Sequence, residues 1–209
     1  LAVQMHAGES VSLTDAEQRK TLEFVIKQVN GRVPVIAHVS DSGTGIAVDR
    51  ARNAERAGAA AVIATSTYYW TPPSPMVFEH ISQIGASVGI PFYLLYTPDE
   101  MGGTHHINTD MVMKLIDKLP NFSGVVDVSH DWQFMINIVS NAWRKKPAFQ
   151  LLAGSEYMVS AGAVGASGFA ADLGAQWKTP VPGLALGAAL QNLGQGVKFE
   201  QETDPLPLT

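Results

Sequence analysis

Apolar and polar residues alternate along the chain in a rhythm that predicts strands and helices in turn. Residues 33–39 are too apolar for a strand with one face in water, and such runs are typical of a parallel sheet covered on both faces. Before this run, Leu22, Val25, Ile26 and Val29 recur at helical spacing. Thr14 and Glu17 stand three residues apart, as in a capping box, so the pattern predicts a helix from there to Gly31.

The same rhythm continues through most of the sequence. Seven strands are predicted, at residues 1–5, 33–39, 60–65, 90–96, 122–128, 149–153 and 165–170. Predicted helices lie between them, including residues 44–57, a helix after Pro75, one capped by Asn108 or Thr109, residues 131–143 and a short helix at 157–163. Strands that start roughly every thirty residues fit βαβ units with right-handed crossovers.

Seven such units predict an α/β protein, a (β/α)8 TIM barrel. The first strand is then absent from the given chain, because the sequence opens inside a strand at Leu1. The alternative is an open, doubly wound parallel sheet. No Gly-x-Gly-x-x-Gly follows any predicted strand, which weakens the dinucleotide-binding version of that alternative.

The rhythm breaks near the C-terminus. We expect a barrel domain at residues 1–174 and an irregular or helical tail at residues 175–209. Within the tail, residues 183–193 are interpreted as a helix weakened by glycines. A complete barrel has a full helix after its last strand, so part of the C-terminal helical region is expected to be missing near residues 174–177.

Composition narrows the class of protein. Apolar residues make up 46% of the 209 and charged residues 16%, which favours a globular domain. The net charge of −5 argues against a nucleic-acid partner. The chain has no cysteine, and the apolar run at residues 183–190 is too short to span a membrane. No signal peptide is recognised, so we expect a cytoplasmic protein without a membrane or nucleic-acid partner.

Candidate chemistry lies at the ends of the predicted strands. In a barrel, functional side chains collect at the C-terminal ends of the strands. Four of these ends carry polar groups, at residues 6–9, 65–73, 96–100 and 127–131.

Six segments, in order, match the motifs of one family. Residues 5–9 followed by Ser-Leu-Thr at 12–14 sit like Gly-Thr-Thr-Gly-Glu followed by Ser-Leu-Thr, and residues 31–37 match the next strand. Tyr68-Tyr69 with the following prolines matches Pro-Tyr-Tyr-x-x-Pro. Leu95-Tyr96 with Pro98 and Gly102 matches Leu-Tyr-Asn-x-Pro-x-x-x-Gly. Residues 122–127 match the segment with Gly-Ile-Lys-Glu or Gly-Ile-Lys-Asp, and residues 152–155 match Leu-x-Ser-Gly-Asp. The chain therefore resembles the dihydrodipicolinate synthase / N-acetylneuraminate lyase family of (β/α)8-barrel lyases over residues 1 to about 170.

The resemblance implies catalytic roles for two tyrosines. Tyr96 falls on the family's proton-relay tyrosine, and Tyr69 on the tyrosine that reaches into a neighbouring subunit's site. From the residues alone, Asp127 is a candidate to assist as an acid or base, paired with His130, although a salt-bridged pair at the rim is the structural alternative.

The resemblance also implies a substrate-binding loop. Gly8 falls on the loop whose backbone N–H groups hold the pyruvate carboxylate, while the two threonines of that loop are His6 and Ala7 here. Glu9 ends the loop, either contacting the ligand or bonding to backbone N–H groups. Glu100 falls near the arginine that grips a substrate carboxylate in dihydrodipicolinate synthase, so a second substrate carboxylate would be repelled.

The largest departure concerns the residue that forms the family's Schiff base. Val126 stands at the position of that lysine, and a valine has no nucleophile. The lysines are predicted to lie on or just after helices or in the tail: Lys20, Lys27, Lys114, Lys118, Lys145, Lys146, Lys178 and Lys198.

Three functions remain open. The first is a lyase or hydratase acting on a small 2-oxo acid by acid–base chemistry with Tyr96, assisted by His6 or Asp127, and without a cofactor. The second is a member that has lost catalysis and binds or regulates. The third is a metal-assisted lyase, for which the scattered His6, Glu9, Asp127 and His130 give only a weak signal, so no metal site is predicted. The resemblance implies a homo-oligomer built as a dimer of dimers.

Overall fold

The computed structural model describes residues 1–70, 72–98 and 107–154, together with the backbone of residues 171–178, 185–193, 197–199 and 202–204. The first three ranges contain a six-stranded parallel sheet whose spatial order is the order in sequence. Its strands are β1 (Ala2–Val3), β2 (Ile36–His38), β3 (Ala61–Ala64), β4 (Phe92–Tyr96), β5 (Phe122–Asp127) and β6 (Gln150–Ala153).

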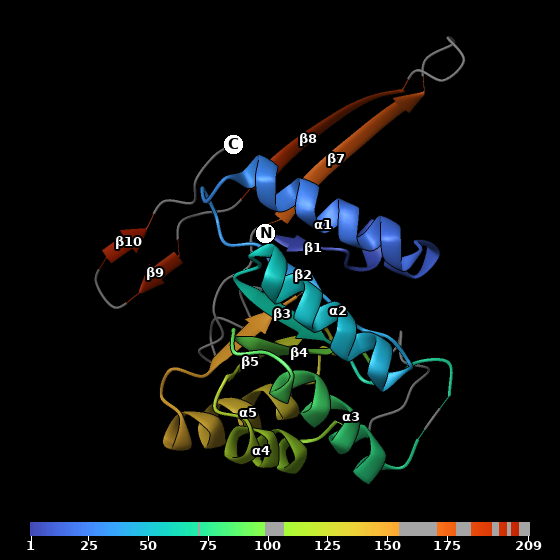
Figure 1. The fold of residues 1–209 in the computed structure, drawn as a ribbon. Coiled ribbons are helices and arrows are strands. Elements are labelled where there is room, and N and C mark those ends of the chain that lie inside the picture. The colour runs from blue at the N-terminus through green and yellow to red at the C-terminus, as the bar shows by residue number, and fades with distance from the viewer. Residues whose placement is uncertain are drawn as a thin grey trace.

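A helix follows each of the first five strands. These helices are α1 (Asp15–Val29), α2 (Thr44–Ala57), α3 (Ser74–Ala86), α4 (Thr109–Lys118) and α5 (Trp132–Lys145). Consecutive helices pack against one another along the outer side of the curled sheet, as Figure 1 shows. The fold is thus an α/β half-barrel, which confirms the expectation of a truncated TIM barrel. The strand predicted at residues 165–170 and the short helix predicted at residues 157–163 lie outside the described residues.

The helix ends follow from local sequence. The capping box at the start of α1 forms as predicted: the Thr14 hydroxyl accepts from the Glu17 N–H, and the Glu17 carboxylate accepts from the Thr14 N–H. At the start of α4 the Asn108 side chain accepts from the Met111 N–H, and at the start of α5 the Asp131 side chain accepts from the Phe134 N–H. Such caps satisfy N–H groups that have no partner within the helix. At the other end of α2, Gly58 adopts a φ of 93°, which a residue with a Cβ rarely does.

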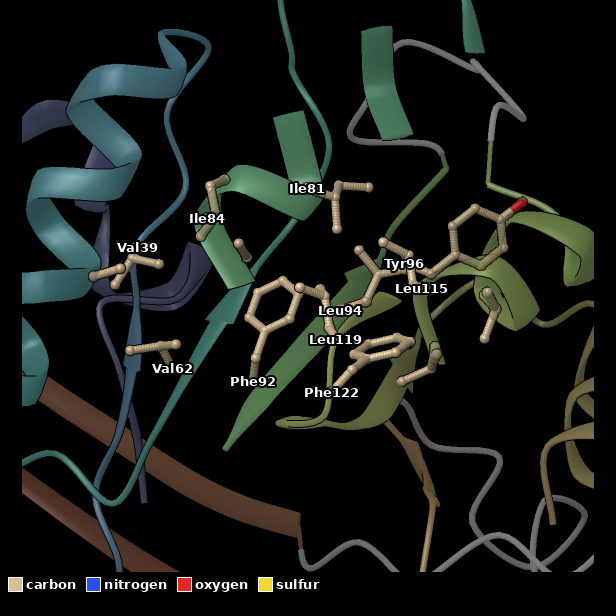
Figure 2. Close-up of a cluster of buried hydrophobic side chains, with 14 of the residues drawn as sticks. Val39, Val62, Ile81, Ile84, Phe92, Leu94, Tyr96, Leu115, Leu119 and Phe122 are labelled. Atoms are coloured by element: carbon tan, nitrogen blue, oxygen red, sulfur yellow. The ribbon is translucent and has the colours of Figure 1, made fainter. Parts of the chain in front are cut away.

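The core lies between the sheet and the helices. Phe92 and Leu94 of β4 and Phe122 of β5 are fully buried against Ile81 of α3 and Leu115 of α4 (Figure 2). Burying one such side chain contributes about 1.5–3 kcal/mol. Side chains alternate between the two faces of a strand, so the residues between these core positions face away from the helices.

The C-terminal strands form two separate antiparallel pairs. β7 (Ala171–Lys178) pairs with β8 (Ala185–Leu193), and β9 (Val197–Phe199) pairs with β10 (Glu202–Asp204). The helix expected at residues 183–193 is therefore wrong. Gly183 and Gly187 weaken a helix there, and the backbone of β8 pairs with β7 instead. The domain boundary at residue 174 stays a prediction. Among the described residues, no helix is both long and apolar enough to cross a bilayer.

Candidate functional site

A cavity of about 240 Å³ opens at the C-terminal ends of β1 to β4. The loop after β1 contributes His6 and Glu9 to its wall. The end of β2 contributes His38 and Ser40, and Thr97 follows β4. The cavity therefore lies where functional groups are expected in a barrel.

His38 is a buried histidine with both ring nitrogens engaged. Nδ1 lies 2.8 Å from the Gln4 backbone oxygen and Nε2 lies 2.7 Å from the Ser40 Oγ. A carbonyl oxygen only accepts, so Nδ1 carries the proton and Nε2 accepts from the Ser40 hydroxyl. Burial lowers the pKa of His38 from 6.5 to about 4, because charging the ring away from water is costly. The imidazole is therefore neutral at pH 7.

The groups around this histidine are held in place by the backbone. Gln4, directly after β1, adopts a φ of 66°, which is uncommon for a residue with a side chain. The Thr65 N–H, after β3, donates to the Ser40 Oγ over 2.8 Å. Hydrogen bonds thus connect the ends of β1, β2 and β3 through His38 and Ser40.

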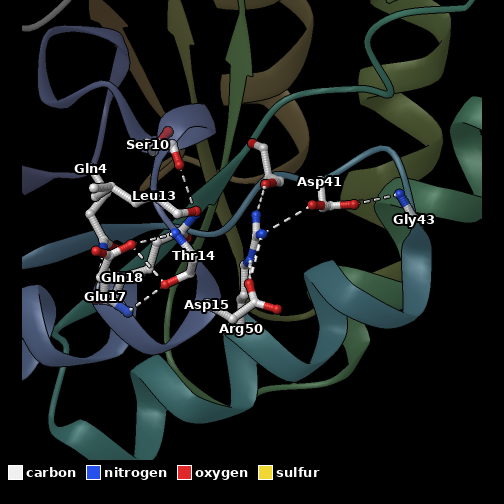
Figure 3. Close-up of polar contacts among 11 residues, drawn as sticks. Gln4, Ser10, Leu13, Thr14, Asp15, Glu17, Gln18, Asp41, Gly43 and Arg50 are labelled. Atoms are coloured by element: carbon white, nitrogen blue, oxygen red, sulfur yellow. Dashed lines mark hydrogen bonds and ion pairs between the residues drawn. The ribbon is translucent and has the colours of Figure 1, made fainter.

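Arg50 of α2 closes one side of the cavity and is paired on several sides. Its guanidinium contacts Asp15 at 2.8 Å and Asp41 at 3.1 Å, and Nη1 donates to the Ser40 backbone oxygen, as Figure 3 shows in part. Its charge is therefore already compensated by protein carboxylates.

Thr97 places a buried hydroxyl in the cavity wall. The residue is 5% exposed, and its Oγ1 has no hydrogen-bond partner within the described part of the chain. Buried polar atoms are normally paired. The oxygen of a bound small molecule could supply the missing partner.

The comparisons with known proteins place the chain in a family. The model of the dihydrodipicolinate synthetase family matches residues 1–177. The chain belongs to this family. The 4-hydroxy-tetrahydrodipicolinate synthase of Methanopyrus kandleri is 35% identical over 124 residues, which cover 59% of this chain and 41% of that protein. That of Oceanobacillus iheyensis is 31% identical over 66% of this chain and 46% of that protein. The chain thus spans less than half the length of these relatives.

Solved structures agree with this assignment. The dihydrodipicolinate synthase of Aquifex aeolicus superposes with a TM-score of 0.74 at 27% identity, covering 79% of this chain and 55% of that one. YagE, a prophage protein of the dihydrodipicolinic acid synthase family from E. coli K12, was crystallised with pyruvate. It superposes with a TM-score of 0.76 over 80% and 56% of the two chains, and at 22% identity it supports the fold alone.

The binding loop expected from the family lies at the cavity. His6, Ala7 and Gly8 form a short 3-10 helix directly after β1, and His6 and Glu9 line the cavity. The rings of His6 and His38 are 6.2 Å apart between centroids. The side chain of Ala7 is outside the described atoms. The roles of these residues in binding stay predictions.

Tyr96 and Asp127 lie together, but on the helix side of the sheet. They are paired in the register of β4 and β5, and Tyr96 packs its ring 4.7 Å from that of Phe134 in α5. Neither is among the residues that line the cavity. Burial is the main cause that raises the pKa of both groups, and the charge of Asp127 raises that of Tyr96 further. Their catalytic roles stay predictions without support from the cavity.

Val126 lies on the opposite face of β5. Its neighbour Val125 is buried in the core, whereas Val126 is half-buried, and a Cβ on Gly154 would approach both Val126 and Val128. Val126 pairs with Leu95 of β4. Glu100 lies outside the described residues.

Tyr69 lies in the loop after β3. Its side chain is fully exposed, and its φ is 79°. A bulky residue with positive φ is a backbone outlier. The adjacent Trp70 is also exposed, at 48%, so both aromatic side chains are open to water on this chain.

The four side chains weighed for a metal do not gather at one point. Among the described residues, no group of three histidines and carboxylates could hold an ion. Asp127, for instance, is fully buried and accepts from the Ser129 N–H.

Sequence reasoning missed the residues that shape the cavity most. His38, Ser40 and Arg50 were not among the candidates, and Thr97 stood only within the polar strand end at residues 96–100, without a role of its own. One signal was available for His38: it is the one ionisable residue in the apolar run of residues 33–39 and stands near the C-terminal end of its strand. A polar residue at that place in a barrel strand indicates a site.

Proposed function

We propose that the chain is part of a lyase that binds a small 2-oxo acid in the cavity at the ends of β1 to β4. The reaction forms or breaks a carbon–carbon bond, or adds water, by acid–base chemistry instead of a Schiff base. The observation that carries this proposal is the cavity wall itself. It combines a neutral, buried His38, whose Nε2 accepts a hydrogen bond from Ser40, with the Thr97 hydroxyl, which has no hydrogen-bond partner among the described residues.

The size of the cavity supports a small ligand. Its volume of about 240 Å³ lies below the range of about 300–1,000 Å³ typical of pockets for drug-sized molecules. A molecule of the size of pyruvate fits this volume.

The charges at the cavity favour a monocarboxylate. Among the described residues that line the cavity, Arg50 is the only arginine or lysine. Asp15 and Asp41 already neutralise its charge. A second substrate carboxylate would have to compete with these two aspartates. Glu100 falls near the arginine that grips a substrate carboxylate in dihydrodipicolinate synthase, so the sequence places a repulsive charge there instead.

The Schiff-base-free mechanism rests on position 126. A valine there offers no amine. The lysines before residue 150 lie on helices or directly after one, and several pair away from the cavity: Lys118 contacts Glu79, Lys145 contacts Asp117, and Lys146 donates to the Pro120 and Phe122 carbonyl oxygens. No lysine whose side chain the structure describes lines the cavity.

The proposed assembly is a homo-oligomer in which Tyr69 lies at a subunit interface. Its full exposure, next to the exposed Trp70, supports this, since soluble monomers seldom leave aromatic clusters open to water. Tyr69 also has a left-handed backbone, and contacts with a partner would compensate the cost of this conformation.

A second candidate is a binding or regulatory protein without catalysis. The position of Tyr96 favours it, because the predicted proton-relay residue packs against Phe134 instead of lining the cavity. A pocket that retained binding but lost its acid–base tyrosine would behave in this way.

Binding and turnover separate the two candidates. Calorimetric titration with pyruvate should show binding that Thr97→Val weakens by about fivefold to tenfold, because one hydrogen bond contributes about 1 kcal/mol. Thr67→Val is the matched control, since Thr67 is also buried, its hydroxyl has no partner in the described part of the chain either, and it does not line the cavity. Release of pyruvate from 4-hydroxy-2-oxo acids would support the lyase. Binding without release would support the second candidate, and no binding would refute both.

A further inference from the structure

We propose that Ser40 and His38 form a proton relay, in which the Ser40 hydroxyl takes a proton from the bound 2-oxo acid while passing its own proton to His38 Nε2. This inference rests on the proposed function and assigns the acid–base step to a residue pair on β2 and its following loop.

The hydrogen-bond directions around Ser40 are fixed by elimination. The Thr65 N–H can only donate, so the Ser40 Oγ accepts from it. His38 Nδ1 donates to the Gln4 carbonyl oxygen, so Nε2 is the acceptor that the Ser40 hydroxyl proton meets at 2.7 Å. One lone pair of Oγ is left for a ligand, and Ser40 lines the cavity.

This arrangement matches the requirements of an activated hydroxyl. A nucleophile or relay needs a base within about 2.6–3.2 Å, and that base needs a third group to orient it. Here the base is His38, and the third group is the Gln4 carbonyl oxygen. The left-handed φ of Gln4 is the kind of local strain that clusters at functional sites.

The proposed step is balanced within the cavity. A C–H bond at C3 of the 2-oxo acid breaks, and its electron pair moves into the C2–C3 bond, leaving an enolate oxygen at C2. The released proton goes to the Ser40 Oγ, and the Oγ proton goes to His38 Nε2. The resulting imidazolium keeps its Nδ1 proton on the Gln4 carbonyl oxygen. Thr97, in the same wall, offers a hydroxyl donor to the enolate.

A purely structural role would have a different signature. His38 and Ser40 also connect the ends of three strands, so removing either could change stability or ligand affinity. A relay predicts instead a loss of proton transfer at unchanged affinity. His38 is here a positioning residue that acts through Ser40.

The test measures two quantities with the 209-residue chain. NMR monitors how fast the methyl protons of pyruvate exchange in D2O, and calorimetry gives the affinity for pyruvate. The wild type should accelerate exchange over buffer. Ser40→Ala and His38→Gln should reduce the acceleration by about 100-fold or more, in line with acid–base catalysis, with affinity changed by less than about threefold. Ser40→Thr, which keeps a hydroxyl, should restore exchange.

Ser42→Ala is the matched control. Ser42 lies in the same loop and loses a comparable bond, from its Oγ to the Tyr68 backbone oxygen, but it does not line the cavity. Its exchange rate should equal the wild-type rate. If Ser40→Ala does not fold, His38→Gln decides the question. Absence of pyruvate binding refutes the proposed function. Two other results would overturn the relay but leave the proposed function standing. In one, the wild type binds pyruvate but does not accelerate proton exchange. In the other, Ser40→Ala and His38→Gln exchange protons as fast as the wild type.

Discussion

Acidification should destabilise the protein because His38 must take up a proton, and His38→Gln should remove this contribution. His38 is 8% exposed, and burial lowers its pKa from 6.5 to about 4 in the folded state. The unfolded chain therefore binds this proton more tightly than the folded one. Stability is fully present above pH 6.5 and is lost as the pH falls towards 4.

The expected magnitude follows from the pKa difference. Each pKa unit corresponds to about 1.4 kcal/mol. Linkage then gives a loss of about 2 kcal/mol in the free energy of unfolding between pH 7 and pH 5, and about 3 kcal/mol by pH 4. Such a change is a large part of the stability of a typical domain.

Urea unfolding at several pH values measures this loss. Other groups also titrate, so the informative quantity is the difference between the wild type and His38→Gln. The variant should start less stable at pH 7 but lose about 2 kcal/mol less between pH 7 and pH 5. Parallel pH profiles for the two proteins would show that His38 is not held neutral by burial, and the described proton arrangement would be wrong.

Three further outcomes are expected. Gly124→Ala should lower the free energy of unfolding by about 2 kcal/mol or more, because its Cβ would meet the Gln150 carbonyl oxygen and the Tyr93 ring. Gly45→Ala, a helical position with open space around it, should be neutral or stabilising in the same melts, and equal losses in both would contradict the packing argument. Asp127→Asn should raise stability at pH 7, because burial raises the pKa of Asp127: the buried carboxylate is costly above that pKa, and the cost is relieved only as the pH falls through it and the group is protonated; a loss at pH 7 would point to an ionic partner. Light scattering at micromolar concentration should give a mass above that of one chain, falling towards one chain in Tyr69→Ser; a wild-type mass of one chain would refute the proposed assembly.

The fold could be predicted because its signals are local and repeated. The capping box at Thr14, the cap at Asn108 and the stop at Gly58 each specify a helix end through chemistry within a few residues. The apolar runs specify strands buried on the helix side. The tail lacked such signals, and the strand over residues 185–193 depends on pairing with β7, a contact that no local pattern reveals.

The site was harder to predict, because it depends on which face of a strand a residue occupies. The family motif has three positions from tyrosine to proline, but Tyr96 and Pro98 are only two apart. A shift of one residue moves a side chain to the other face of the sheet. Tyr96 lies with Leu94 in the core (Figure 2), and Thr97 reaches the cavity. The hydrogen bonds of Ser40 and His38 form only when the ends of β1, β2 and β3 lie side by side. No pattern within one segment predicts them.

The claim that the chain works without a Schiff base is tested most directly by borohydride trapping. The protein is incubated with pyruvate and borohydride, and its intact mass is measured. An iminium between a lysine and the 2-oxo group would be reduced to a stable secondary amine. We expect no adduct on the wild type, and an adduct on Val126→Lys if the face of β5 that carries Val126 still admits a 2-oxo acid. Stoichiometric, borohydride-dependent labelling of one lysine in the wild type would contradict the account.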